Sequence, residues 1–205
     1  MQAFDSLSRD IQQYIYDKGW PSLKNIQSAA IKQVANTDHN LILSAPTASG
    51  KTEAAFIPAL NSIEDWETGL KVLYVSPLKA LINDQFQRIS ELSEYLDIPI
   101  TRWHGEVSQT QKRKVVNQPK GILLITPESI EGMLVNRPGE AEHLFKGVEW
   151  IIIDELHSFL GTERGIHLQS LLQRISRFMQ APRFIAMSAT LNKKDFGYAK
   201  AFFGS

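Results

Sequence analysis

The sequence contains no cysteine, which removes several kinds of chemistry. Disulfide bonds, thiolate metal sites and cysteine nucleophiles are all excluded for these 205 residues. Long hydrophobic stretches are also missing, because no apolar run approaches the roughly 20 residues that span a bilayer. The first ten residues include Asp5, Arg9 and Asp10 and lack the apolar stretch of a signal peptide. We therefore expect a soluble, cytoplasmic protein with no membrane partner.

An excess of charge of either sign is absent too. Lys plus Arg and Asp plus Glu each number 22, so the formal net charge is zero. This balance argues against nucleic-acid binding by bulk charge, but it leaves room for a local strip of backbone amides and hydroxyls. No internal repeat or low-complexity tract is present. The length can bury one substantial core, so we expect one domain over residues 1–205.

Residues 45–52 carry the strongest local motif. They read A-P-T-A-S-G-K-T and follow the apolar run Leu41–Leu43, which indicates a strand, a turn and the start of a helix. The pattern is that of a phosphate-binding loop with Ala45 in the first glycine position. Backbone N–H groups and the helix N-terminus then bind nucleotide phosphates, Lys51 reaches the β- and γ-phosphates, and Thr52 holds Mg²⁺. The predicted nucleotide-binding residues of the loop are Pro46, Thr47, Ala48, Ser49, Gly50, Lys51 and Thr52.

A second signal is an apolar strand that ends in two carboxylates. Ile151–Ile153 precede Asp154 and Glu155, and His157 follows two residues later. Asp154 is expected to hold Mg²⁺ through water, since this ion keeps much of its hydration shell. Glu155 is expected to orient or deprotonate the attacking water, and His157 to relay toward a neighbouring domain. An acidic pair alone is more often a helix cap or a solvated turn, but together with the phosphate loop it favours nucleotide hydrolysis.

Aliphatic runs alternate with helical patterns almost throughout the chain. Strands are predicted at Leu41–Ser44, Lys71–Ser76, Ile98–Trp103, Gly121–Thr126, Val148–Asp154 and Arg183–Ser188. Helices are predicted at Lys51–Ile63, Lys79–Tyr95, Gln109–Val116, Pro127–Val135, His167–Met179 and Lys193–Phe203. This order predicts an α/β domain with a doubly wound, mainly parallel sheet covered by helices on both faces. Residues 1–37 are expected to form a helical lead-in of two helices.

In these motifs the chain resembles the first RecA-like, ATP-binding domain of superfamily-two helicases of the DExH/DEAD-box type. It is most similar to the Lhr-like and superkiller-like branches, and the resemblance covers essentially the whole chain. It implies a RecA-like P-loop NTPase fold, with ATP and Mg²⁺ as cofactors and a single strand of DNA or RNA as partner. It also implies ATP hydrolysis coupled to translocation or unwinding in the full-length protein. The family's later motifs do not follow Thr190, so we expect the second RecA-like domain of the same polypeptide outside this chain.

The resemblance also implies roles for further residues. Gln27 is expected to read adenine, because an amide side chain can both donate and accept hydrogen bonds. The implied nucleic-acid-binding residues are Pro77, Leu78, Lys79, His104, Gly105, Thr126, Pro127, Glu128 and Arg164. Ser188, Ala189 and Thr190 are implied to couple the nucleotide state to closure of two motor domains. Taken singly these signals are weak. The less favoured alternative for Gln27 is a plain helix-face residue, and Arg164 is equally well explained as a surface ion-pair partner.

Ala48 departs from the family pattern, which usually has glycine at this position. If the position requires a positive φ, alanine costs on the order of 1 kcal/mol and weakens nucleotide binding. Two alternative functions stay open. One is the motor of a restriction or defence complex, which translocates without strand separation. The other is a non-catalytic nucleotide-dependent nucleic-acid-binding module, which the intact Asp154 and Glu155 disfavour.

Overall fold

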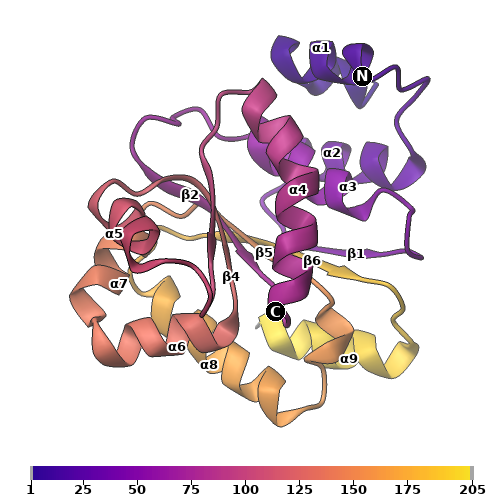
Figure 1. The fold of residues 1–205 in the computed structure, drawn as a ribbon. Helices are drawn as coiled ribbons and strands as arrows, with labels where there is room; N and C mark the ends of the chain where they lie inside the picture. Colours follow the sequence, from indigo (N-terminus) through magenta and orange to yellow (C-terminus); the bar gives the residue numbers. More distant parts are fainter. Residues whose placement is uncertain (1, 204–205) are drawn as a thin grey trace.

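A six-stranded sheet forms the centre of the molecule (Figure 1). The structure is a computed structural model, and it describes residues 2–203. The strands are β1 (Leu41–Ser44), β2 (Gly69–Val75), β3 (Ile100–Trp103), β4 (Lys120–Ile125), β5 (Trp150–Ile153) and β6 (Arg183–Ser188). Their order is β1-β6-β5-β2-β4-β3, and every neighbouring pair is parallel. The predicted parallel α/β sheet is confirmed.

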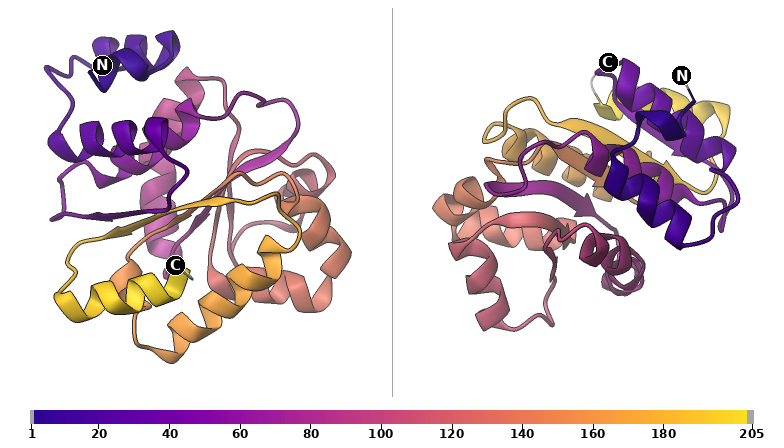
Figure 2. Two further views of the ribbon diagram at one scale, coloured as in Figure 1. Left: turned by 180° about the vertical axis from the view of Figure 1, so that it is seen from behind. Right: turned by 90° about the horizontal axis from the view of Figure 1, so that it is seen from above.

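Helices cover both faces of this sheet (Figure 2). The longer helices are α1 (Arg9–Asp17), α2 (Asn25–Asn36), α3 (Lys51–Asn61), α4 (Lys79–Tyr95), α5 (Gln109–Asn117), α6 (Pro127–Asn136), α7 (Pro138–Phe145), α8 (Glu163–Ser176) and α9 (Lys193–Phe203). Two short 3-10 turns lie at η1 (Phe4–Ser6) and η2 (Leu156–Ser158). Helices α1 to α4 pack on one face of the sheet and α6 to α9 on the other. Successive side chains of each strand point to opposite faces, so the strands contribute to two separate cores.

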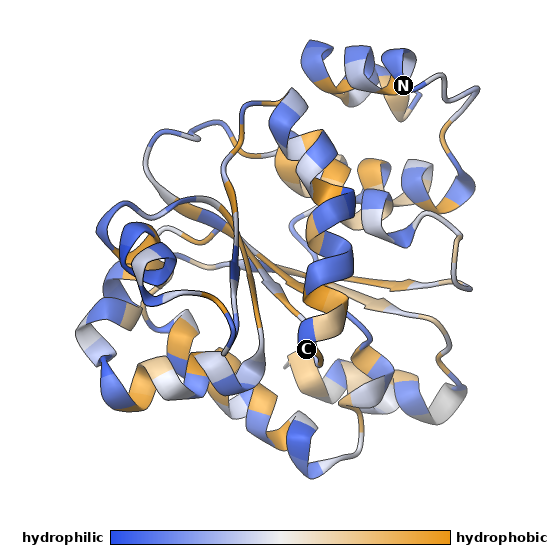
Figure 3. Cartoon of the chain, viewed as in Figure 1, coloured by the Kyte–Doolittle hydropathy of each residue, from blue (hydrophilic) through white to orange (hydrophobic). Residues whose placement is uncertain are grey.

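The strands are apolar on both faces. In β2, Val72 and Tyr74 enter the core beneath α1 to α4, and Leu73 and Val75 enter the core beneath α6 to α9. Figure 3 shows this as hydrophobic strands crossing the centre between helices of mixed hydropathy. Such two-sided burial is typical of parallel sheets. Among the described residues, no helix combines the length and the apolar character needed to cross a bilayer.

Two helices differ from the sequence-based expectation. Helix α7 was not predicted, because Arg137-Pro138-Gly139 reads as a turn; Pro138 instead occupies the first helical turn, where its missing N–H costs nothing. Helix α8 begins at Glu163 rather than at His167. Its N-cap is Thr162, whose hydroxyl accepts a hydrogen bond from Gly165 N at 3.1 Å. The stripe of buried leucines identified the body of α8 but not its polar first turn.

Candidate functional site

The sheet order divides the carboxyl edge into two adjacent halves. Strands β1, β6 and β5 end in the phosphate loop, the segment Ser188–Thr190 and the acidic pair. Strands β2, β4 and β3 end in the segments around Pro77, Thr126 and His104. Apart from Gln27 on α2, the residues predicted to bind nucleotide are thus grouped at three neighbouring strand ends. Apart from Arg164 on α8, those predicted to bind a nucleic-acid strand are grouped at the other three.

The phosphate loop connects β1 to the N-terminus of α3. Its first residue remains part of the sheet, since Ala45 N donates to Ser188 O at 3.2 Å. Gly50 is the residue before α3 and has a left-handed backbone (φ +86°), which glycine adopts without steric cost. Ala54 N then donates to Gly50 O at 2.9 Å as the helix begins. The free N–H groups of the first turn of α3 therefore face the loop.

Ala48 also has a positive φ, of +62°. The condition on which the sequence-based expectation rested is therefore met. Alanine in this region is strained by about 1 kcal/mol or more, because its Cβ approaches the following carbonyl oxygen. Its carbonyl accepts a hydrogen bond from Lys24 Nζ at 3.1 Å, which holds this residue from the side of α2. The expected weakening of nucleotide binding stays a prediction.

Lys51 and the acidic pair line the same hollow. Lys51 Nζ donates to Ala45 O at 2.5 Å and to Pro46 O at 2.8 Å, so the side chain folds over its own loop. A hollow of about 120 Å³ lies beside it, lined by loop residues, Asp154 and Glu155. A cation, loop N–H groups and two carboxylates are therefore gathered at one point. This combination suits a phosphate group with a divalent cation.

Asp154 is held from two sides at the end of β5. Its side chain is 6% exposed; Oδ1 accepts a hydrogen bond from Glu155 N at 2.9 Å, and Oδ2 accepts one from the Tyr74 hydroxyl. Burial raises the pKa of this carboxyl above its ordinary value, while the bond from Tyr74 acts in the opposite direction. A buried carboxylate facing a hollow is a suitable ligand for a cation, which compensates the cost of desolvation.

His157 connects the acidic pair to the coupling segment. Its Nδ1 lies 3.1 Å from Ser188 Oγ and 3.2 Å from Glu155 Oε2. Glu155 itself has a left-handed backbone (φ +48°), which turns the chain sharply into η2. The Ser188 side chain is 1% exposed and its hydroxyl also donates to Thr190 O at 3.0 Å. Of the predicted coupling residues, Ser188 therefore contacts the acidic segment directly, and Thr190 is joined to it through Ser188.

Gln27 lies on the N-terminal turn of α2, against the phosphate loop. It is 3% exposed, and its Oε1 accepts a hydrogen bond from Lys24 N at 2.8 Å. Its Nε2 is so near Gly50 that a Cβ at that glycine would lie 2.7 Å away. Gln27 is thus wedged between α2 and the loop in this conformation. Its predicted role as an adenine reader stays a prediction.

Sequence reasoning missed several side chains around the hollow beside Lys51, among them Met187 of β6 and three residues of α4. Leu81, Gln85 and Arg88 line the same hollow as Lys51 and Asp154. Gln85 Oε1 accepts a hydrogen bond from Thr52 Oγ1 at 3.0 Å. Their spacing could have identified them, because Leu81, Gln85 and Arg88 are four and three positions apart and such residues share one face of a helix. This face continues directly from the segment Pro77–Lys79.

The three segments predicted to bind a strand are tied to one another by ion pairs. Lys79 pairs with Glu106, which joins the start of α4 to the loop after β3. Arg164 Nη2 lies 2.6 Å from Glu128 Oε1 and also donates to Pro77 O, so it joins the loops after β2 and β4. Arg164 is therefore a surface ion-pair partner. That role leaves its predicted contact with nucleic acid untested.

His104 lies inward at the end of β3. The side chain is 5% exposed, and neither ring nitrogen has a hydrogen-bond partner among the described residues. Burial lowers the pKa of this imidazole. Its neighbour Gly105 is exposed, so in this conformation Gly105 is open to solvent and the His104 side chain is not. Thr126 caps α6 and is 8% exposed, while Leu78 is 55% exposed.

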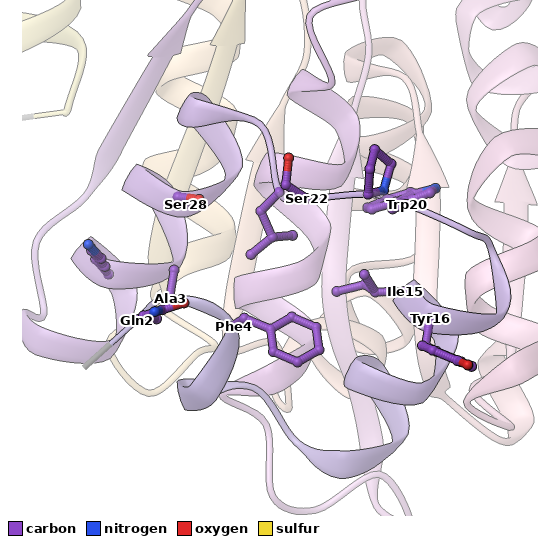
Figure 4. A pocket seen from close by; sticks show the side chains of 11 residues that line it. Gln2, Ala3, Phe4, Ile15, Tyr16, Trp20, Ser22 and Ser28 are labelled. Atoms are coloured by element: carbon purple, nitrogen blue, oxygen red, sulfur yellow. The ribbon is translucent and has the colours of Figure 1, made fainter.

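A larger hollow, of about 520 Å³, lies in the helical lead-in (Figure 4). Phe4, Ile15 and Trp20 surround it, together with Ser28 and Lys32 of α2. It contains no carboxylate and none of the loop residues. Size alone therefore does not identify the candidate site: the groups able to act on a phosphate surround the smaller hollow at the strand ends.

Comparisons with known proteins agree with this geometry. A family model described as "DEAD/DEAH box helicase" matches residues 24–196. The chain is 36% identical over 183 residues to the ATP-dependent helicase Lhr-Core protein 2 of Thermococcus barophilus, covering 80% of this chain and 21% of that protein. It is 29% identical over 209 residues to the Lhr-Core helicase of Methanocaldococcus jannaschii, covering 93% of this chain and 24% of that protein.

A solved structure has the same fold. The Mycobacterium smegmatis helicase Lhr bound to ssDNA and AMP-PNP aligns with a TM-score of 0.83 at 27% identity, over 95% of this chain and 26% of that one. The chain thus spans about a quarter or less of these relatives. The predicted RecA-like fold is confirmed, and the chain belongs to the DEAD/DEAH box helicase family.

Proposed function

We propose that residues 1–205 are the ATP-binding motor domain of a nucleic-acid helicase. One observation carries the proposal: Lys51 of the phosphate loop and the pair Asp154–Glu155 line one hollow at the ends of β1 and β5, the two strands that flank β6. ATP hydrolysis in the longer protein would drive translocation along, or unwinding of, DNA or RNA. The named relatives are helicases, which supports this assignment. Residues 1–37 would serve as the helical lead-in that carries Gln27, and the cytoplasmic location stays a prediction.

The residues at the ends of β1, β6 and β5, together with Gln27, would each have a different role in ATP binding and hydrolysis. Backbone N–H groups of the loop and Lys51 would bind the phosphates, and Gln27 at the start of α2 would read the adenine. Thr52 and Asp154 would hold Mg²⁺, which when bound neutralises charge that develops on the phosphates. Glu155 orients the attacking water and accepts its proton. His157 passes a change at Glu155 on to Ser188, because its ring lies against both.

A single nucleic-acid strand is the proposed partner of the other half. Pro77–Lys79, Gly105 and Thr126–Glu128 lie along the ends of β2, β3 and β4 and offer hydroxyls, backbone amides and helix starts. The ssDNA bound to the M. smegmatis relative supports this choice. The arginine that acts on the transferred phosphate would come from a second RecA-like domain of the same polypeptide.

The test uses the polypeptide that contains both motor domains, with ATPase activity measured with and without single-stranded DNA or RNA. Glu155→Gln should retain ATP binding and lose turnover, because it keeps the shape of the side chain but not the base. Lys51→Ala should lose ATP binding as well. Normal ATPase activity of either variant would overturn the assignment. The 205-residue chain alone should hydrolyse ATP very slowly, and strand separation by it would contradict the proposal.

A further inference from the structure

An open groove of about 350 Å³ lies between α5 and α6, beside the segments after β3 and β4 that are proposed to bind nucleic acid. Its walls are formed by Gln109 and Lys112 of α5 and by Asn136 and Arg137 at the end of α6, and its floor by Trp103 and Met133. A volume of this size is within the range of ligand sites, about 300–1,000 Å³. None of the predicted nucleotide-binding residues lines it.

The groove is positively charged, although the chain as a whole is neutral. Helix α5 carries Lys112, Arg113 and Lys114 and contains no acidic residue. Among the described residues, no carboxylate forms an ion pair with any of these three cations. On the opposite wall, Arg137 is exposed and pairs with Glu140 at 3.3 Å. Of these cations, Lys112 and Arg137 line the groove, and no carboxylate of the described residues does. Two cations on facing walls of a hollow without a carboxylate favour an anionic occupant.

Lys112 is directed by the floor of the groove. Its Nζ lies 5.7 Å from the centre of the Trp103 ring, within the range of a cation–π contact. Trp103 is 7% exposed and Met133 is 4% exposed, so the floor is apolar and fixed by the core. An ammonium group above an apolar floor suits a phosphate linked to a sugar. Nothing in this arrangement selects a particular base.

The groove is continuous with two segments already proposed to hold a strand. Gly105, after β3, and Ser129, in the first turn of α6, both line it. We propose that this groove binds a further phosphate and sugar of the same single strand, beyond those at Gly105 and Thr126–Glu128. The inference rests on the proposed function, because it extends the path of the strand across α5. Lys112 and Arg137 would contact the additional phosphate.

The test compares oligonucleotides of increasing length, from about 4 to about 12 nucleotides, by fluorescence anisotropy at low salt with the whole chain. Lys112→Gln and Arg137→Gln should each weaken binding of the long oligonucleotides about fivefold, and lower the slope of log affinity against log salt by about 0.7 per lost phosphate contact. The shortest oligonucleotides that still bind should be unaffected. Lys112→Arg, which keeps the charge, should retain the affinity.

Lys146→Gln is the matched control, because Lys146 is an exposed lysine just after α7, near the start of β5 and hence at the opposite edge of the sheet. It should leave binding at every length unchanged. If the chain binds long oligonucleotides and both groove variants bind them like the unchanged chain, the inference is wrong while the proposed function stands. Equal weakening at all lengths also overturns it. Failure of the unchanged chain to bind any oligonucleotide overturns both.

Discussion

The phenolic hydroxyl of Tyr74 donates a hydrogen bond to the carboxylate of Asp154 across the boundary between β2 and β5. Tyr74 is fully buried, and burial together with the nearby carboxylate raises its pKa well above the ordinary value. The hydroxyl therefore keeps its proton and remains a donor. The bond therefore links β2, which leads to the proposed nucleic-acid-binding segment Pro77–Lys79, to Asp154 in the candidate nucleotide site.

Tyr74→Phe should weaken Mg²⁺-dependent nucleotide binding. The substitution removes the bond to Oδ2, so Asp154 loses its orientation and its pKa rises further. A lost hydrogen bond of about 1 kcal/mol corresponds to an approximately fivefold higher Mg²⁺ concentration at half-saturation. A Mg²⁺ titration of nucleotide binding measures this. Tyr95→Phe, which removes a surface bond to Asp17, should change nothing, and an equal effect of both variants would contradict the argument.

Ala48→Gly should stabilise the chain. The folded loop holds Ala48 at φ +62°, and glycine relieves this strain at the expense of a more flexible unfolded chain. The net gain in the free energy of unfolding should be about 0.5–1 kcal/mol, measured by denaturant titration. Ala181→Gly is the matched comparison, since Ala181 has φ +47° in an exposed turn. A gain at Ala181 with a loss at Ala48 would show that glycine is disfavoured in the loop.

Gly50→Ala should disrupt the junction between the loop and α2. Its new Cβ would lie 2.7 Å from Gln27 Nε2, in addition to the strain of alanine at φ +86°. Gly19→Ala has the strain alone, because Gly19 has φ +64° and open space around its Cβ position. Because Nε2 is the end of a side chain that can move, we expect Gly50→Ala to cost only about 1 kcal/mol more than Gly19→Ala in thermal unfolding.

Gln27→Ala provides the second half of this experiment. It removes the atom that the new Cβ would meet, so the double variant should recover most of the extra loss seen in Gly50→Ala. Strict additivity of the two substitutions would exclude the steric explanation.

His104→Leu should stabilise the chain and reduce its sensitivity to acid. Burial lowers the pKa of His104 in the folded chain, with Glu106 acting upward and Arg102, Lys112 and Lys79 downward. The unfolded state then takes up the proton first, so stability is complete above the usual histidine pKa of about 6.5 and falls as the pH drops below it. Removing two unpartnered nitrogens should also contribute about 1–3 kcal/mol.

Urea titrations at several pH values between about 5 and about 7.5 test this, because the slope with pH reports the difference in bound protons. His104→Leu should show a flatter profile than the unchanged chain. His39→Leu, at an exposed histidine, should retain the original slope. Parallel profiles for all three proteins would contradict the role given to His104.

Much of the fold follows from local patterns. Aliphatic runs located all six strands, and the leucine spacing Leu168, Leu171 and Leu172 located the core of α8, because buried parallel strands and amphipathic helices have distinct periods. The strand order does not follow from such patterns. It depends on which crossover packs best in three dimensions, and several orders satisfy the same alternation of strands and helices.

The candidate nucleotide site was accessible to sequence reasoning because the loop and the acidic pair are each a motif of consecutive residues. Tyr74 was not, since a tyrosine inside an apolar strand reads as a core residue until its hydroxyl is seen beside Asp154. Gln85 was hidden for a similar reason, because its partner Thr52 lies 33 positions away. Contacts between distant segments require the packing of the sheet before they can be assigned.

The bond from Ala45 to Ser188 has a mechanical consequence. Strand β6 is paired on one side with β1 and on the other with β5, so two neighbouring ladders fix the points where the loop, the Ser188 segment and the acidic pair leave the sheet. Sliding one root against another would break several backbone bonds at once. The sheet therefore holds Ala45 in place, and any conformational change of the phosphate loop is confined to residues Pro46 to Gly50, before α3 begins.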